Sequence, residues 1–216
     1  MKKIKFFLKE NKMFIITILI LLGGQSIMYY GLKFFQTNPN YINYYLDDEI
    51  PFIGYFIYIY NMFYPFTLIA LYYLYRKDKD SYYKGIISGT IGYLICDVIF
   101  ILYPTIMYRP IIPKLSPITD FVINLTFLYD NPPLNCFPSI HCLFSFQVIY
   151  SFLSSNLTKR DKFIITIVFL LIIISTLLVK QHYIFDVISA FLICVITNLM
   201  EDLLGIYKKI KKKFNR

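Results

Sequence analysis

Long apolar stretches fill this 216-residue chain, and short clusters of lysine and arginine separate them. A helix that crosses a membrane needs about 20 predominantly apolar residues. Hydrophobic residues make up 57% of the chain and charged residues only 16%, whereas soluble domains carry roughly 25% charged residues. We therefore expect an all-α polytopic membrane protein, a six-transmembrane-helix bundle with a single membrane domain over residues 1–216. The expected spans are 13–35, 50–75, 85–108, 137–157, 163–179 and 183–204.

The N-terminal segment carries three lysines among its first five residues and then an apolar run. Signal peptides and first membrane spans share this pattern. Here the apolar run is too long for a signal peptide and is not followed by a small-residue cleavage site. We expect the segment to be retained as the first span.

The basic residues are distributed unevenly between the two ends of the spans. Eighteen of the 22 lysines and arginines lie before the first span, after the second, after the fourth or after the sixth. With six spans these positions share one side, which the positive-inside rule makes cytoplasmic. We expect a multi-pass plasma-membrane protein with both termini in the cytoplasm. Its net charge of +9 then reflects topology and contact with anionic membrane lipids, not nucleic-acid binding. The opposite side receives only Lys33, Arg109, Lys114 and Lys180.

The chain has only two histidines, and both fall at extracytoplasmic ends of expected spans. Ionisable residues within membrane segments are rare and usually functional. His182 lies four residues before Asp186, so the two side chains share one face if the segment is helical. The carboxylate can then accept the Nδ1 proton and leave the other ring nitrogen free to attack or to take a proton. The alternative is a purely structural hydrogen bond.

The other histidine closes the run Phe137-Pro138-Ser139-Ile140-His141. Pro138 suits the first turn of a helix, and Ser139 and His141 would then lie in that turn. The free amides and positive dipole end of a helix start form an anion site, to which a serine adds a hydroxyl donor. The alternative is a plain helix start.

Two basic residues lie on the same side as the histidines. Arg109 follows the third span and can hold a phosphate through two donors at once. Lys180 lies two residues before His182 and adds a second positive charge. Each alone would be an interfacial anchor, but together with the histidines they indicate phosphoryl transfer, which needs charged donors around the phosphoryl oxygens. One histidine would attack phosphorus, and the other would protonate the leaving oxygen.

These residues resemble the signature motifs of the type 2 phosphatidic acid phosphatase superfamily. The resemblance covers roughly residues 85–204. It is most similar to the inositolphosphotransferase-like branch in three forms: Pro-Thr…Arg-Pro, Phe-Pro-Ser-x-His and Lys-Gln-His-Tyr-x-x-Asp-Val. It implies a helical bundle with a phosphate pocket at one end. The three motifs are Arg109-Pro110, then Pro138-Ser139-Ile140-His141, then His182 with Asp186.

The resemblance also implies roles. His182 is the nucleophile that forms a phosphohistidine, Asp186 orients it, and His141 protonates the leaving group. Arg109 and Ser139 bind the phosphate. The assignment requires no metal and no other cofactor.

Three positions depart from the family pattern. Leu102 stands where the first motif has a lysine, Thr176 where the third has an arginine, and Ile140 where the second has a glycine. Two phosphate-binding charges are therefore missing. Our hypothesis is that Lys180 replaces one of them.

We expect a membrane lipid phosphatase that hydrolyses a lipid phosphate or diphosphate monoester at the extracytoplasmic face. Its partners are then the lipid phosphate substrate and membrane lipids. One alternative is a lipid phosphotransferase that uses the same phosphohistidine with a hydroxyl acceptor. Another is a non-catalytic membrane bundle with degraded motifs, such as a small transporter or a lipid-binding remnant. The sequence leaves the lipid and the oligomeric state open.

Four cysteines and one aspartate complete the polar candidates. We expect Cys96 and Cys194 to be small core residues. Cys136 and Cys142 are close enough in sequence to pair, and a zinc site that includes His141 is a weaker alternative, since no fourth ligand has a metal-like spacing. Asp97 lies within the third span, where we expect a hydrogen bond to a tyrosine; the alternative is a role in substrate coupling.

Overall fold

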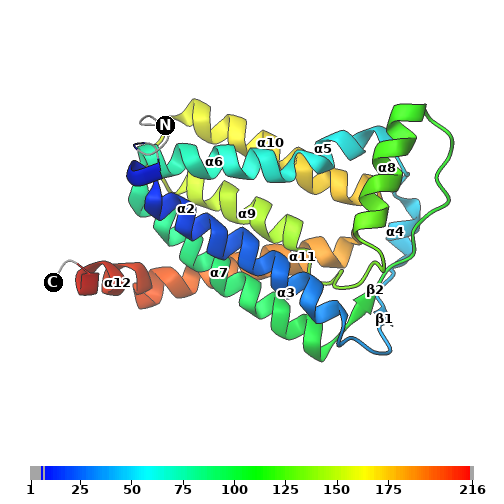
Figure 1. Ribbon diagram of the computed structural model, residues 1–216, viewed down its shortest axis with the longest axis horizontal. Coiled ribbons are helices and arrows are strands. Elements are labelled where there is room, and N and C mark those ends of the chain that lie inside the picture. The colour runs from blue at the N-terminus through cyan, green and yellow to red at the C-terminus, as the bar shows by residue number, and fades with distance from the viewer. Residues whose placement is uncertain (1–5, 7, 215–216) are drawn as a thin grey trace.

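The computed structural model describes residues 6 and 8–214, which form a bundle of long helices lying side by side (Figure 1). Lys2, Lys3, Lys5 and Arg216 of the predicted basic clusters lie outside the described residues. In chain order the elements are α2 (Lys12–Ile18), η1 (Leu19–Gly23), α3 (Gly24–Lys33), β1 (Asn40–Tyr41), α4 (Tyr45–Glu49), η2 (Gly54–Phe56), α5 (Ile57–Asn61), α6 (Phe63–Lys77), α7 (Lys79–Leu102), β2 (Thr105–Ile106), α8 (Pro117–Tyr129), α9 (Ile140–Leu153), α10 (Lys159–Leu178), α11 (Ile184–Leu204) and α12 (Ile206–Phe214).

Within the described residues, five helical segments are long and apolar enough to cross a membrane, which confirms the predicted all-α membrane bundle. They correspond to the first, second, third, fifth and sixth expected spans. A further apolar helix of 14 residues, α9, stands in place of the fourth, so a sixth crossing helix stays a prediction. The five segments are Lys12–Lys33, Gly54–Lys77, Lys79–Leu102, Lys159–Leu178 and Ile184–Leu204.

The third span is displaced from its expected position. Helix α7 begins at Lys79 and ends at Leu102, not at 85 and 108. Asp78 caps its start, because the carboxylate accepts a hydrogen bond from the Ser81 amide at 3.0 Å. Pro104 disfavours helix at the residue before it and so ends α7 early. As a result Arg109 lies in a loop, well past the end of the helix.

The start of α9 also differs from the expectation. Pro138 precedes the helix and does not open it, since Ser139 is the N-cap and its Oγ accepts a hydrogen bond from the Cys142 amide at 3.2 Å. A side-chain acceptor at the N-cap satisfies one of the free amides of the first turn. His141 does lie in that turn, as predicted, whereas Ser139 lies just before it.

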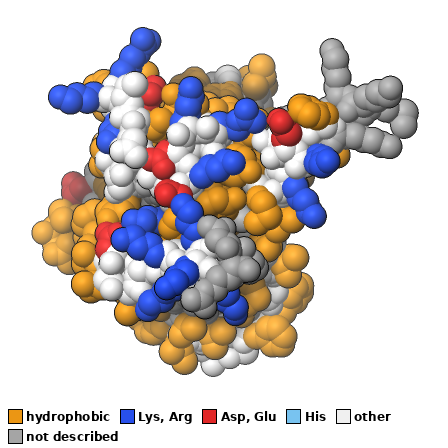
Figure 2. All heavy atoms as spheres, turned by 90° about the vertical axis from the view of Figure 1, so that its left-hand side faces the viewer, with side chains coloured by type: hydrophobic (Ala, Val, Ile, Leu, Met, Phe, Trp, Pro, Cys, Tyr) orange, Lys and Arg blue, Asp and Glu red, His pale blue; other side chains and the backbone are white. Residues whose placement is uncertain are grey.

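The basic clusters meet at one end of the bundle, which we call the basic end. Here α6 ends, α7 and α10 begin and α11 ends (Figure 1). Figure 2 faces this end and shows lysine and arginine side chains spread across it. Gly205, in the left-handed conformation with φ 56°, ends α11 and turns the chain into the lysine-rich helix α12.

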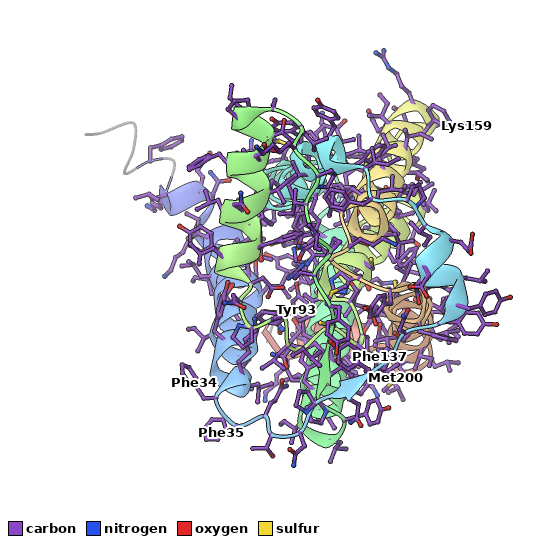
Figure 3. The ribbon with its side chains drawn as sticks, turned by 90° about the vertical axis from the view of Figure 1, so that its right-hand side faces the viewer. Phe34, Phe35, Tyr93, Phe137, Lys159 and Met200 are labelled. Atoms are coloured by element: carbon purple, nitrogen blue, oxygen red, sulfur yellow. The ribbon has the colours of Figure 1, made fainter. Side chains whose placement is uncertain are left out.

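The opposite end, which we call the loop end, carries the short elements. Strands β1 and β2 pair in parallel, with Asn40 opposite Thr105. The connection before α9 contains helix α8, which the sequence analysis did not predict. Ser116 caps α8 and Pro117 occupies its first position, and this Ser-Pro start is a recognisable signal. In Figure 3, which looks onto the loop end, α8 and α4 lie on either side of Phe137.

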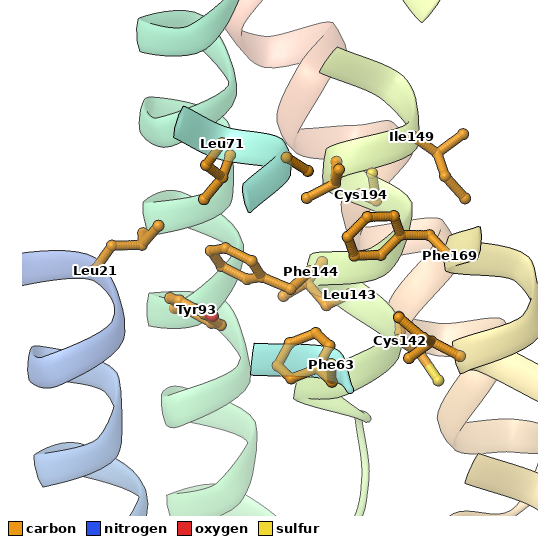
Figure 4. Close-up of a cluster of buried hydrophobic side chains, with 14 of the residues drawn as sticks. Leu21, Phe63, Leu71, Tyr93, Cys142, Leu143, Phe144, Ile149, Phe169 and Cys194 are labelled. Carbon is orange, nitrogen blue, oxygen red and sulfur yellow. The ribbon is translucent and has the colours of Figure 1, made fainter. Parts of the chain in front are cut away.

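The hydrophobic core surrounds α9. This helix packs against α6, α7, α10 and α11. Figure 4 shows Leu143 and Phe144 of α9 between side chains from the neighbouring helices. The rings of Phe144 and Tyr93 of α7 stack with centroids 4.5 Å apart. The central helix is therefore held by contacts on several sides.

Glycines in α7 allow this close packing. A Cβ atom added to Gly85 would lie 2.2 Å from Ser151 Oγ, and one added to Gly92 would lie 3.2 Å from Leu143 Cδ2. In membranes, small residues at a helix interface let the backbones approach and gain van der Waals contact. The contact between α7 and α9 therefore depends on these positions.

Polar groups inside the bundle differ in part from the expectation. Asp97 accepts a hydrogen bond at 3.3 Å from Gln25 of α3, not from a tyrosine. Neither residue could be matched from sequence, since 72 positions separate them. All four cysteines are buried and free, so Cys136 and Cys142 do not pair.

We predict that Gly85→Ala lowers the stability of the bundle by about 1–3 kcal/mol, since the new methyl group overlaps Ser151. Thermal unfolding in detergent measures the change. Gly31→Ala in α3 is the matched control, because a Cβ there meets nothing within 4 Å. Adding Ser151→Gly should restore part of the loss; equal stability of the Gly85 and Gly31 variants would contradict the prediction.

Candidate active site

A cavity of about 550 Å³ opens at the loop end between α3, α5, α6 and α8. Its walls are mainly aromatic and aliphatic, and both histidines of the chain line it. Ligand sites in proteins are commonly concave and largely apolar, with a few convergent polar groups. We call it the histidine cavity; its lining includes Tyr29, Tyr60, Phe63, Asp130, His141, Gln181 and His182.

His182 is held in the turn between α10 and α11. Its backbone amide and that of Gln181 both donate to the carbonyl of Thr176, at 3.2 and 2.9 Å. His182 precedes α11, whose N-cap is Tyr183, so the predicted helical face is not what pairs it with Asp186. Asp186 instead reaches back from the first turn, where it accepts from the Tyr183 amide at 2.9 Å and lies 3.1 Å from His182 Nδ1.

The contacts of Nδ1 fix which nitrogen of the His182 ring carries the proton. Nδ1 lies 3.1 Å from the Asp186 carboxylate and also 3.1 Å from the carbonyl oxygen of Cys136. Both partners are acceptors, so Nδ1 carries the proton. In the neutral ring Nε2 is then unprotonated. The Asp186 carboxylate, which is 1% exposed, thus keeps Nε2 of His182 unprotonated.

His141 faces the same cavity from the first turn of α9. Its ring packs against Phe63 and Tyr60, with centroids 4.6 and 5.0 Å away. The two histidine rings are 6.0 Å apart between centroids. The structure therefore brings together residues 41 positions apart, as the motif spacing predicts.

Ser139 links the two histidine segments through its backbone. Its amide donates to the carbonyl of Asp186 at 3.2 Å, while its hydroxyl caps α9. The side chain is fully buried and is already engaged by the Cys142 amide. Its proposed contact with phosphate stays a prediction.

Arg109 lies beside the cavity and is engaged by an aspartate. Its Nη2 donates to Asp130 Oδ2 at 2.5 Å, and Nη1 donates to the Lys180 carbonyl at 3.4 Å. The guanidinium carbon stands 4.5 Å from the centre of the Phe127 ring. The other oxygen of Asp130 accepts from Lys33 of α3 at 2.8 Å.

Lys180 points toward α4. Its Nζ donates to the carbonyl of Asp47 at 2.6 Å. Burial lowers the pKa of Lys180, and the charges of Asp47 and Asp48 oppose this shift. Its suggested replacement of a missing family charge is untested and stays a prediction.

The positions of the two missing family charges differ in environment. Leu102 is the last residue of α7 and is 77% exposed. Thr176 is fully buried, and its hydroxyl donates to the carbonyl of Ile173 at 2.7 Å. Neither provides a charge to the histidine cavity.

Four residues of the site were missed by the sequence analysis. Asp130 and Gln181 line the cavity, Lys33 binds Asp130, and Asp47 supports the turn before α11. Gln181 is adjacent to His182 in the sequence, and this position could have marked it as a site residue. The other three come from distant segments, and no local pattern marks them. Among the described residues, no three His, Cys, Asp or Glu side chains gather as a metal site would require.

The fold and the site together define a membrane protein of the all-α class with two histidines and a buried carboxylate at one cavity. The family model of the PAP2 superfamily matches residues 35–200. The chain therefore belongs to the PAP2 superfamily, which confirms the predicted family; its branch stays a prediction. Family membership supports a phosphatase-type lipid phosphoesterase. Comparisons with curated proteins and with solved structures give no match.

We predict that Asp47→Ala destabilises the turn that holds His182. The carboxylate is 3% exposed, and it accepts from the Ile184 amide at 2.8 Å and the Tyr44 amide at 2.9 Å. Losing such a cap costs about 1 kcal/mol. Thermal unfolding should show a lower Tm than Asp48→Ala, a change at its exposed neighbour. The same Tm for both variants would contradict this role.

Proposed function

We propose that this protein is a membrane-embedded lipid phosphatase that works through a phosphohistidine at His182. The observation that carries the proposal is the pair of histidine rings 6.0 Å apart in one largely apolar cavity, one of them held by a buried carboxylate. Such a cavity suits a phosphorylated head group joined to an apolar chain.

In the first step, Nε2 of His182 attacks phosphorus and forms the N–P bond. The bond between phosphorus and the leaving oxygen breaks, and its electron pair stays on that oxygen. Protonated His141 donates a proton to it and becomes neutral. Asp186 keeps the proton on Nδ1 and stabilises the positive charge that develops on the ring.

In the second step, His141 acts as the base. It takes a proton from a water molecule, whose oxygen attacks phosphorus. The N–P bond breaks, and its electron pair returns to Nε2 of His182. Inorganic phosphate is released, and both histidines regain their starting protonation states. A diphosphate substrate would leave a lipid monophosphate in the first step.

The proposed phosphate contacts are Arg109, Ser139 and Lys180, and the geometry supports them to different degrees. Arg109 is coupled to the cavity through Asp130, which lines it. The Ser139 hydroxyl already accepts a hydrogen bond from the Cys142 amide, and the Lys180 ammonium donates to a backbone carbonyl of α4. The geometry therefore favours Arg109 as the principal contact.

The proposed location of the reaction is the extracytoplasmic face of the plasma membrane. Support comes from the charges at the other end of the bundle, since basic clusters between spans favour the cytoplasm. The histidine cavity lies at the loop end, where few lysines and arginines occur.

We predict that His182→Ala abolishes phosphate release from lipid phosphates by the purified protein. His141→Ala should lower it by about a hundredfold to ten-thousandfold, the usual contribution of a general acid. An aryl phosphate distinguishes the two roles, because its leaving group needs no proton. It should restore the His141 variant and leave the His182 variant inactive.

Lys84→Gln, at the basic end, is the control for this experiment and should keep parental activity. Equal phosphate release by the His182 variant and the parent would refute the enzyme proposal and favour a non-catalytic bundle. Phosphate transfer to an added diacylglycerol or polyprenol, without free phosphate, would indicate the phosphotransferase alternative.

We also predict a role for Gln181 in substrate contact. It is 2% exposed, and its Nε2 is buried beside both histidines without a hydrogen-bond partner among the described residues. A buried, unsatisfied donor costs about 1–3 kcal/mol. Gln181→Met should therefore keep or raise Tm while lowering phosphate release about tenfold. Parental turnover in this variant would rule the contact out.

A further inference from the structure

A lysine, an aspartate and an arginine from three distant segments meet beside the histidine cavity. Lys33 Nζ lies 2.8 Å from Asp130 Oδ1, and Arg109 Nη2 lies 2.5 Å from Oδ2. The side chains are 9% exposed for Lys33, 16% for Arg109 and 23% for Asp130. Asp130 lines the cavity together with both histidines. One carboxylate thus bridges two largely buried cations.

The position of Asp130 is unfavourable for its own helix. It is the C-cap of α8, where the unpaired carbonyls carry partial negative charge. Carboxylates stabilise helix starts and not helix ends. The Asp130 carboxylate is therefore held by Lys33, by Arg109 and by the Tyr29 hydroxyl, which donates to Oδ1 at 2.8 Å, and not by the charge at the end of α8.

The surroundings of the cations make their charge effective. Lys33 lies 4.7 Å from the centre of the Tyr29 ring and 5.5 Å from that of Tyr30. Arg109 packs against Phe127. Aromatic walls exclude water, and a charge interacts more strongly there than in bulk solvent. Two cations in such a setting bind an anion with two oxygens well, and Asp130 is the anion present.

We propose that Asp130 is an internal competitor that occupies Lys33 and Arg109 until a substrate phosphate displaces it, and that Lys33 is the second phosphate-binding cation. This inference rests on the proposed function and deepens it. Leu102, where the family has a lysine, faces outward from α7, and Lys33 of the adjacent helix α3 supplies the charge instead.

Displacement sets a threshold for binding. The free energy needed to move Asp130 aside is the same for every anion, so it lowers the affinity for each of them by the same factor. A phosphate monoester carries about −1.5 to −2 charges at pH 7 and binds two cations strongly. A phosphodiester carries a single charge, as the carboxylate does, and gains little from the exchange. The site therefore takes terminal phosphates and leaves the phosphodiester lipids of the membrane unbound.

Binding of soluble anions to the purified protein tests this inference without turnover. The probes are methyl phosphate, a monoester, and dimethyl phosphate, a diester. We expect Asp130→Asn to bind methyl phosphate about tenfold more tightly and to bind dimethyl phosphate measurably, unlike the parent. Lys33→Gln should bind methyl phosphate about tenfold more weakly. Lys114→Gln, an exposed lysine at the same end, should match the parent.

Weaker binding by Asp130→Asn would overturn the competitor role, because Asp130 would then orient Arg109. Parental binding by Lys33→Gln would remove Lys33 from the phosphate site. If Asp130→Asn leaves the cations unpaired and does not fold, the double variant with Lys33→Gln keeps the net charge. It should bind methyl phosphate more tightly than Lys33→Gln alone, and equal or weaker binding would overturn the proposal.

The outcome also separates this inference from the proposed function. A parent that releases no phosphate but shows this binding pattern would refute the enzyme and keep the anion competition. A parent that releases phosphate while all variants bind equally would refute the competition alone.

Discussion

The arrangement at the loop end depends on the buried aspartate of α11. The Asp186 carboxylate accepts from the Tyr183 amide, which caps the helix, and holds the His182 ring. The backbone carbonyl of Asp186 accepts from the Ser139 amide at the start of α9. One residue therefore fixes the orientation of one histidine and the position of the segment that carries the other. Burying a carboxylate is costly unless hydrogen bonds offset the cost. The bonds of Asp186 Oδ2 hold the site together, whereas Oδ1 is buried without a partner among the described residues.

Features that repeat locally could be predicted from the sequence. Apolar length and clustered lysines identified five helices, because the membrane imposes the same requirement on each. The motif containing His141 and the spacing of His182 and Asp186 identified the histidine pair. A shared helical face does not pair these two residues, since His182 precedes the helix and Asp186 reaches back as part of the helix cap. Local caps and local helical faces both bring residues four apart into contact.

Contacts between distant segments could not be predicted. Lys33 and Asp130 are separated by 97 positions, and Gln25 and Asp97 by 72. Each residue alone has an ordinary explanation as an interfacial or intramembrane polar group. Only the packing of α3 against α7 and the presence of α8 give them partners. The start of α8 was marked by Ser-Pro, but within a segment of mixed polarity that signal carried little weight.

The short length of α9 follows from where it lies. Its 14 residues extend about 21 Å, less than the roughly 30 Å of a bilayer core. Matching to bilayer thickness applies to surfaces that touch lipid. Longer helices surround α9, and its side chains are mostly buried, so α9 contacts mainly protein and not lipid. The depth of His141 is thus set by its neighbours, and lipid composition acts on the outer helices first.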